Sequence, residues 1–248
     1  MKEILIGIVQ GLTEFLPVSS SGHIAVLEHY LGIFSGDLSR EVALHLATLL
    51  AVLIYFRRKI YHLIVDWAGG RNLSYLWYLI LGSIPAGVVG LLFESRIEDA
   101  FSSLSAIAVC FIFTGLVLLS TLVVKSGGEK ITGIRSLIVG IAQALAIFPG
   151  VSRSGSTISA GLHLKLTGEE AFEFSFLLSI PAIAGAGLLE IKKVGFSALI
   201  SHWPGIISSF IFGYIALLFL NKIVKKGKLY VFSPYLLALG LLLLIAGG

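Results

Sequence analysis

Six apolar runs constrain this chain more than any other feature, because each is long enough to cross a lipid bilayer. About 20 apolar residues in a helix span the hydrocarbon core, where only helices and closed barrels satisfy their own backbone. With 56% apolar and 13% charged residues and a mean hydropathy of +0.97, the composition excludes a soluble domain. We therefore predict an all-α integral membrane protein with six transmembrane helices. The runs cover about 42–56 (extended back to Leu38), 75–93, 104–124, 171–190, 204–221 and 230–247.

Two further apolar segments, about 4–16 and 134–148, are too short to cross. A helix of about 13 residues rises about 20 Å, against a hydrocarbon core of about 30 Å. Each segment therefore ends near mid-membrane, at a proline and a Ser/Gly turn, and the chain returns through 22–33 and 155–166. Broken backbone at that depth must be buried in protein or line a wet cavity. We predict two re-entrant helical hairpins.

The two hairpins share an internal repeat. Residues 7–22 align without gaps on residues 140–155, with nine of sixteen positions identical at a constant offset of 133. The differences fall on polar positions: Glu14 has no acidic counterpart in the second copy, and Arg153 has no basic counterpart in the first. This pattern indicates a duplicated scaffold whose halves have taken different chemical tasks.

The Lys and Arg residues predict the orientation, because cytoplasmic loops of membrane proteins are enriched in them. They cluster after the first, third and fifth spans, which puts both termini on the extracytoplasmic side, with the acidic loop 94–99. Lys192 and Lys193 depart from the rule. The net charge of +4 therefore arises from residues that set the membrane orientation. We expect no nucleic-acid partner. The clusters are Arg57, Arg58, Lys59 and Arg71; Lys125, Lys130 and Arg135; and Lys222, Lys225, Lys226 and Lys228.

Each half of the chain is then one hairpin followed by three spans. An odd number of spans turns the second half over, so we predict a single membrane domain, 1–248, made of two inverted repeats, about 1–125 and 134–248. This arrangement places a site near the membrane midplane, between two broken helices. The single Cys110 lies in an apolar run, so no disulfide framework exists.

Gln10 and Glu14 are four residues apart and so share one helix face. A carboxylate on an apolar helix near mid-membrane is costly, which makes Glu14 a candidate functional residue. The alternative is a structural partner for an arginine, with Arg153 the nearest candidate.

The first turn reads Ser19-Ser20-Ser21-Gly22-His23. His23 can exchange a proton near neutral pH, and a serine beside a base can act as a nucleophile. The helix that follows would also present its positive end to an anion. The alternative is a serine-rich helix cap.

The second turn contains Ser152, Arg153, Ser154 and Thr157. The forked guanidinium suits phosphate oxygens, and the hydroxyls and the next helix N-terminus add further donors. This turn has no carboxylate, so we expect it to bind an anion. Taken together, the two turns indicate phosphoryl-group chemistry in a membrane. On the first span, His45 is either a proton relay or a packed side chain.

These two motifs together resemble the undecaprenyl pyrophosphate phosphatases of the bacitracin-resistance type, and the resemblance covers essentially the whole chain. It implies removal of the terminal phosphate from a polyprenyl diphosphate, in the cell membrane, to recycle the lipid carrier for cell-wall synthesis and give bacitracin resistance. It also implies a divalent cation, Mg²⁺ or Ca²⁺, with Glu14 as its candidate ligand. The implied catalytic residues are Glu14, Ser20, His23 and Arg153, with Gln10, Ser19, Ser21, Ser152, Ser154 and Thr157 binding the phosphates.

Several alternatives stay open at this level. Ser20, His23 or water could attack the phosphorus, and a homodimer is among the expected partners beside the lipid substrate and the bilayer. Inverted repeats with broken helices are also typical of transporters, so a transporter or flippase of a polyprenyl phosphate is the alternative function. A second class of lipid phosphatase has a Ser-Gly-His turn, but its Lys-rich first motif is missing here.

Overall fold

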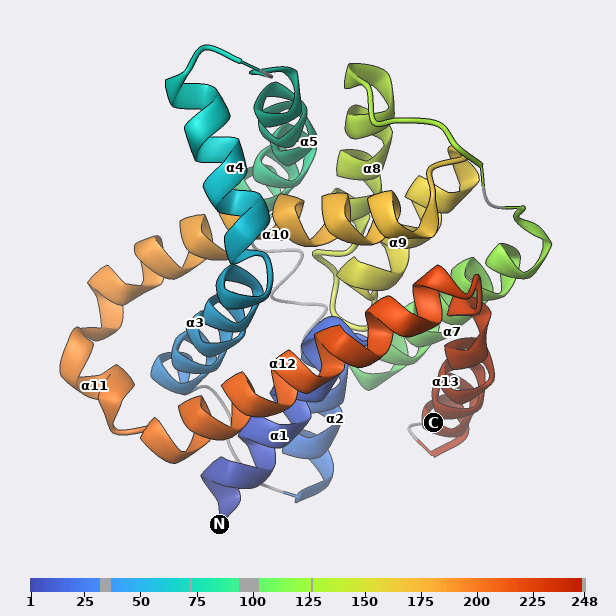
Figure 1. Cartoon of the computed structure of the whole chain (residues 1–248). Coiled ribbons are helices and arrows are strands. Elements are labelled where there is room, and N and C mark those ends of the chain that lie inside the picture. The colour runs from blue at the N-terminus through green and yellow to red at the C-terminus, as the bar shows by residue number, and fades with distance from the viewer. Residues whose placement is uncertain (32–36, 72, 94–102, 126, 247–248) are drawn as a thin grey trace.

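The computed structural model describes all residues except 32–36, 72, 94–102, 126 and 247–248, so the predicted acidic loop 94–99 lies outside the described residues. The described chain is almost entirely helical (Figure 1), with six helices long and apolar enough to cross a membrane. The prediction of an all-α, multi-pass membrane protein is confirmed. The spans are α3 (Leu38–Tyr55), α5 (Leu73–Leu92), α7 (Leu104–Ser120) with η1 (Thr121–Val123), α10 (Gly168–Val194), α12 (Trp203–Lys225), and η2 (Leu229–Phe232) with α13 (Ser233–Ala246).

Four shorter helices form two contacting pairs. α1 (Lys2–Phe15) packs against α2 (Ser20–Leu31), and α8 (Gly133–Leu145) packs against α9 (Arg153–His163). A proline-containing turn separates the helices of each pair, as the sequence predicts for the hairpins. The depth of these pairs in a bilayer, the inverted repeat and the division into two halves stay predictions.

The first helix of each pair packs on a span from the other half of the chain. α1 lies along α12, where Gly7 leaves no room for a Cβ beside the Gly205 carbonyl. α8 lies along α5, where Gly140 is equally close to the Gly82 carbonyl. Gly7 and Gly140 occupy equivalent positions of the sequence repeat. Small residues let membrane helices approach closely, so each hairpin is held by the opposite half.

The tips of the two hairpins touch, as the sequence predicts. The backbone N–H of Gly150 donates to Ser19 Oγ (3.2 Å), and Ser154 Oγ donates to the Leu16 carbonyl (3.4 Å). A Cβ on Gly22 would lie only 2.9 Å from Gly150 Cα, so this contact requires a glycine. Residues separated by half the chain therefore share one site.

A polar cluster joins the first turns of α1, α3 and α12. Arg40 donates to Glu3 Oε1 (3.1 Å) and to Asp37 Oδ2 (2.9 Å), and His202 Nδ1 lies 3.2 Å from Glu3 Oε2. Burial opposes ionisation of Asp37, but hydrogen bonds from Ser39 and the Arg40 N–H, with the charge of Arg40, hold its pKa below the ordinary value. The cluster fixes the start of α1, which carries Glu14 further along.

The sequence analysis predicts plain loops in two connections where the structure has helices. These helices are α4 (Arg57–Ala68) and α11 (Phe196–Ile200). α4 buries Leu63 and exposes Arg57 and Arg58, so it is amphipathic. The apolar residues of this stretch have helical spacing, but the prediction used only its positive charges.

Candidate active site

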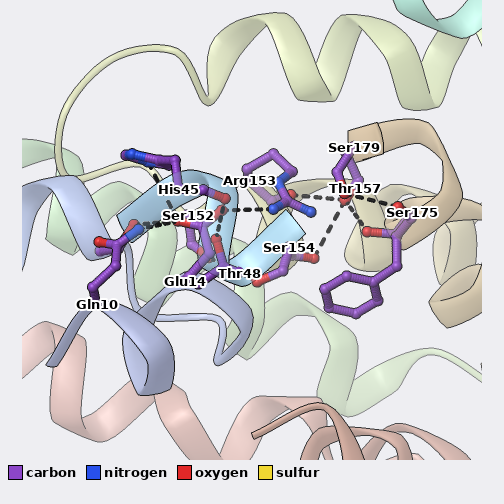
Figure 2. Close-up of polar contacts among 12 residues, drawn as sticks. Gln10, Glu14, His45, Thr48, Ser152, Arg153, Ser154, Thr157, Ser175 and Ser179 are labelled. Carbon is purple, nitrogen blue, oxygen red and sulfur yellow. Dashed lines mark hydrogen bonds and ion pairs between the residues drawn. The ribbon is translucent and has the colours of Figure 1, made fainter. Parts of the chain in front are cut away.

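Glu14 is the centre of the polar contacts between the hairpins. Its Oε1 accepts a hydrogen bond from Arg153 Nη2 (2.8 Å), and its Oε2 accepts from Ser20 Oγ (2.7 Å) and Gln10 Nε2 (3.2 Å). His45 Nε2 of α3 lies 3.8 Å from the same Oε2. Figure 2 shows Gln10, His45 and Arg153 arranged around Glu14. One carboxylate therefore connects a cation, a hydroxyl and an imidazole.

Gln10 and Glu14 share one face of α1, as their spacing of four residues predicts. One helical turn brings the two side chains into direct contact. Gln10 is fully buried, and its Oε1 has no hydrogen-bond partner among the described residues. Glu14 is ionised without a large cost only because it is paired and hydrogen-bonded. Glu14 is therefore the partner of Arg153, and its functional role stays a prediction.

Arg153 is the first residue of α9, so its guanidinium lies beside the positive end of that helix. Its side chain is 16% exposed and packs over the Phe176 ring, 5.6 Å from the centroid. Nη2 binds Glu14, while Nη1 is buried with no partner among the described residues. A buried guanidinium N–H without an acceptor is costly, so this atom is a candidate donor to a bound anion.

The turn before α2 holds Ser20 toward Glu14. Ser19 has a left-handed backbone (φ 69°), an unusual conformation for a residue other than glycine. Its hydroxyl accepts from the N–H groups of Gly22 (3.4 Å) and Gly150 (3.2 Å) and lies 3.3 Å from Ser21 Oγ. Ser19 therefore caps α2 and ties the two tips, while Ser20 Oγ is the hydroxyl that contacts the carboxylate.

His23 makes its polar contacts with Ser19 and Tyr235, although the sequence places it in the same motif as Ser20. Its Nδ1 donates to the Ser19 carbonyl (2.8 Å), and its Nε2 lies 2.6 Å from the Tyr235 hydroxyl. The ring also stacks on Tyr235 and meets Phe111 edge-on. Within the described residues the polar contacts of His23 thus hold the turn and connect it to α13.

The hydroxyls of the second motif are buried, and their hydrogen bonds are to other groups of the protein. Ser152 Oγ caps α9 by accepting from the Gly155 N–H (3.1 Å) and lies 3.3 Å from Ser154 Oγ. Thr157 Oγ1 lies 2.6 Å from Ser175 Oγ of α10. These contacts fix the turn that presents Arg153, and Figure 2 shows them beside it.

Two residues that the sequence analysis does not name, Thr114 and Tyr235, complete the site together with His45. Thr114 of α7 donates to the Gly150 carbonyl (3.1 Å) and accepts from the Ser152 N–H (3.1 Å), which fixes the second turn. Tyr235 binds His23, and His45 lies against Glu14. Each of the three is a polar side chain inside a predicted span, which the sequence shows. The sequence does not show which residue each of them contacts.

The residues around Glu14 do not form a cation site by themselves. Both carboxylate oxygens already accept hydrogen bonds, and in the described ranges no group of three or more His, Cys, Asp or Glu converges. Mg²⁺ and Ca²⁺ prefer several oxygen ligands. The divalent cation and its ligand Glu14 stay predictions from the resemblance.

The chain is similar to known proteins over nearly its whole length. The chain is 41% identical over 250 residues to a protein of Thermotoga petrophila, covering 99% of this chain and all of that protein. It is 39% identical to one of Desulforapulum autotrophicum (98% and 97% covered) and 40% identical to one of Methanococcus maripaludis (95% of each). All three are named undecaprenyl-diphosphatase. Because the model of the bacitracin resistance protein BacA family matches residues 3–242, this chain belongs to that family.

Proposed function

We propose that this protein is a membrane phosphatase that hydrolyses undecaprenyl diphosphate, or a related polyprenyl diphosphate, to the monophosphate and phosphate. This reaction would recycle the lipid carrier for cell-wall synthesis and give bacitracin resistance. The observation that carries the proposal is Glu14, which contacts Ser20 through one oxygen and Arg153 through the other. The names of the relatives support the same reaction.

Arg153 is the group we assign to the terminal phosphate. Its unpartnered Nη1 and the N-terminus of α9 present positive charge at the junction of the two hairpins. A fixed, buried donor stabilises the charge that builds on phosphoryl oxygens during transfer better than water does. Ser152, Ser154 and Thr157 support this donor mainly by holding the turn.

Ser20 is the group we assign to attack. Its hydroxyl lies 2.7 Å from Glu14 Oε2, within reach for proton transfer. Ser20 Oγ would bond to the terminal phosphorus as the bond to the bridging oxygen breaks, which releases the lipid monophosphate and leaves phosphoserine. Water then displaces the serine and releases phosphate. His23 is engaged by Ser19 and Tyr235, so Glu14 is the base beside Ser20.

The alternative, a transporter or flippase of a polyprenyl phosphate, needs neither an aligned nucleophile nor a base. The contact between Ser20 and Glu14 and the names of the relatives favour hydrolysis. The extracytoplasmic placement of both termini and of the site, and a homodimer, belong to the proposal as predictions. Cysteine labelling of each terminus in intact cells and mass measurement in detergent check them.

The deciding experiment measures phosphate release from C55 diphosphate by purified protein in detergent. We expect release by the wild type, and loss of release in Glu14→Ala and in Arg153→Ala. Folding of each variant is checked by its thermal transition. Absence of release from folded wild-type protein, with lipid movement in reconstituted vesicles, would favour the transporter instead.

A further inference from the structure

His45 of α3 lies beside Glu14, the carboxylate that contacts Ser20. Its Nδ1 lies 2.9 Å from the carbonyl oxygen of Glu41, one turn earlier in α3, and its Nε2 lies 3.8 Å from Glu14 Oε2 (Figure 2). A carbonyl oxygen only accepts hydrogen bonds, so Nδ1 carries a proton. The neutral ring then presents a free lone pair at Nε2, directed to the carboxylate that holds Ser20.

This arrangement suits passage of a proton from Glu14. An ionised carboxylate and a neutral Nε2 are both acceptors, so the resting pair carries no proton between these two atoms and can take up one. The 3.8 Å between Nε2 and Oε2 is longer than a direct hydrogen bond, so the two groups must approach before a proton passes between them. His23 offers no such acceptor to Glu14, because Ser19 and Tyr235 engage its two nitrogens.

His45 is also more exposed than Glu14. The Glu14 side chain is 9% exposed, whereas that of His45 is 41% exposed. His45 and Gln10 line a cavity of about 80 Å³ between α1, α2 and α3, a volume that holds water. Glu28 and Glu41 line the same cavity and supply acceptors along it.

We propose that His45 acts through Glu14 as the proton-holding positioning residue of the phosphoryl transfer, an inference that rests on the proposed function. When Ser20 Oγ attacks, its proton passes to Glu14 and then to His45 Nε2, which becomes imidazolium as the lipid monophosphate leaves. The proton then reaches water through the cavity. In the second step the attacking water returns one proton to Ser20 Oγ through Glu14, and its oxygen leaves with the phosphate.

Charged groups from several helices lie around His45 and the cavity beside it. Glu14 of α1 is the nearest, with Arg153 of α9 on its far side. Arg40 and Glu41 precede His45 on α3, and Glu28 of α2 lines the cavity. Glu190 of α10 acts on Glu41 and adds negative charge on that side. Carboxylates thus outnumber guanidinium groups around the ring and its cavity.

The test compares His45→Gln and His45→Ala with wild type from roughly pH 5 to 9, where an imidazole changes its charge. Gln keeps a polar side chain but cannot accept the proton. We expect kcat to fall by about 10²-fold with KM nearly unchanged, and the acid-side fall of kcat to disappear. Added imidazole should restore His45→Ala, and should not restore Ser20→Ala.

His62 of α4 is exposed and supplies the matched control, so His62→Gln and His62→Ala should keep wild-type rates with or without imidazole. An unchanged acid-side profile in His45→Gln, or no imidazole effect on folded His45→Ala, would overturn this role while wild-type hydrolysis leaves the proposed function intact. If His45→Ala does not fold, the profile of His45→Gln decides. No hydrolysis by wild type would remove both proposals together.

Discussion

Arg153 Nη2 lies 2.8 Å from Glu14 Oε1, and this ion pair joins two helix termini that are 139 residues apart in the chain. Both partners are largely buried, with side chains 16% and 9% exposed. Removing one partner would leave an unpaired charge in a poorly solvated site, which is more costly than removing both. The pair therefore connects the stability of the fold with the assembly of the site.

A double-mutant cycle separates these two effects. We expect Glu14→Gln or Arg153→Met alone to lower the free energy of unfolding by about 3 kcal/mol, and the double variant to lose less than the sum of the two. All three should be inactive. Thermal unfolding in detergent and phosphate release are the measurements, and additive losses would contradict a direct coupling of the two residues.

Arg153→Lys tests the geometry of the clamp without removing its charge. A lysine ammonium cannot contact Glu14 and a phosphate oxygen through one planar fork. We expect kcat/KM to fall by about 10²-fold while the thermal transition stays near that of wild type. Wild-type kinetics in this variant would refute the assigned role of Arg153.

Ser20→Ala should lower kcat by at least about 10³-fold, because it removes the attacking oxygen. Wild-type protein quenched in acid during turnover should carry phosphoserine at Ser20, detected by peptide mass measurement. Ser21→Ala is the neighbouring control and should retain this phosphoserine, since Ser21 Oγ contacts Ser19 and not Glu14. Near-full turnover by Ser20→Ala would exclude the serine route.

Gly22→Ala tests whether the hairpin tips must touch. The new Cβ would lie 2.7 Å from Phe111 Cζ and 2.9 Å from Gly150 Cα, so the tips must separate. We expect a loss of about 1–3 kcal/mol in stability, and reduced phosphate release. Gly87→Ala of α5 is the matched control, because a Cβ there meets no atom within 4 Å. Equal behaviour of the two variants would refute a tight junction.

Cation binding should depend on the substrate, because the described side chains form no preassembled site. We expect Mn²⁺, followed by its electron spin resonance signal, to bind the free protein with a Kd weaker than about 1 mM. A non-hydrolysable diphosphate analogue should tighten this binding by supplying phosphate oxygens. Tight binding to the free protein would contradict this expectation and locate a site elsewhere.

Local patterns are enough to predict the six spans and the two pairs of short helices, but they do not predict α4 and α11. Apolar length identifies the six spans within a few residues, and the proline and Ser/Gly turns mark where the short helices end. The hydroxyl of Thr167, the N-cap residue of α10, accepts from the Glu170 N–H (3.1 Å), which is a local contact. The Glu170 side chain accepts from the Ile131 N–H (2.9 Å), a contact with a distant loop that no local pattern predicts.

The sequence by itself determined that this chain is a helical membrane protein and that its polar residues gather in two equivalent turns. Those conclusions depend on helix length, burial cost and side-chain chemistry, which are local. Only the tertiary structure decided that Ser20 faces Glu14, that His23 turns to Tyr235, and that His45 approaches from α3. The packing of α1 on α12 and of α8 on α5 sets these directions, because contacts between distant helices fix rotation about each helix axis and the sequence pattern does not.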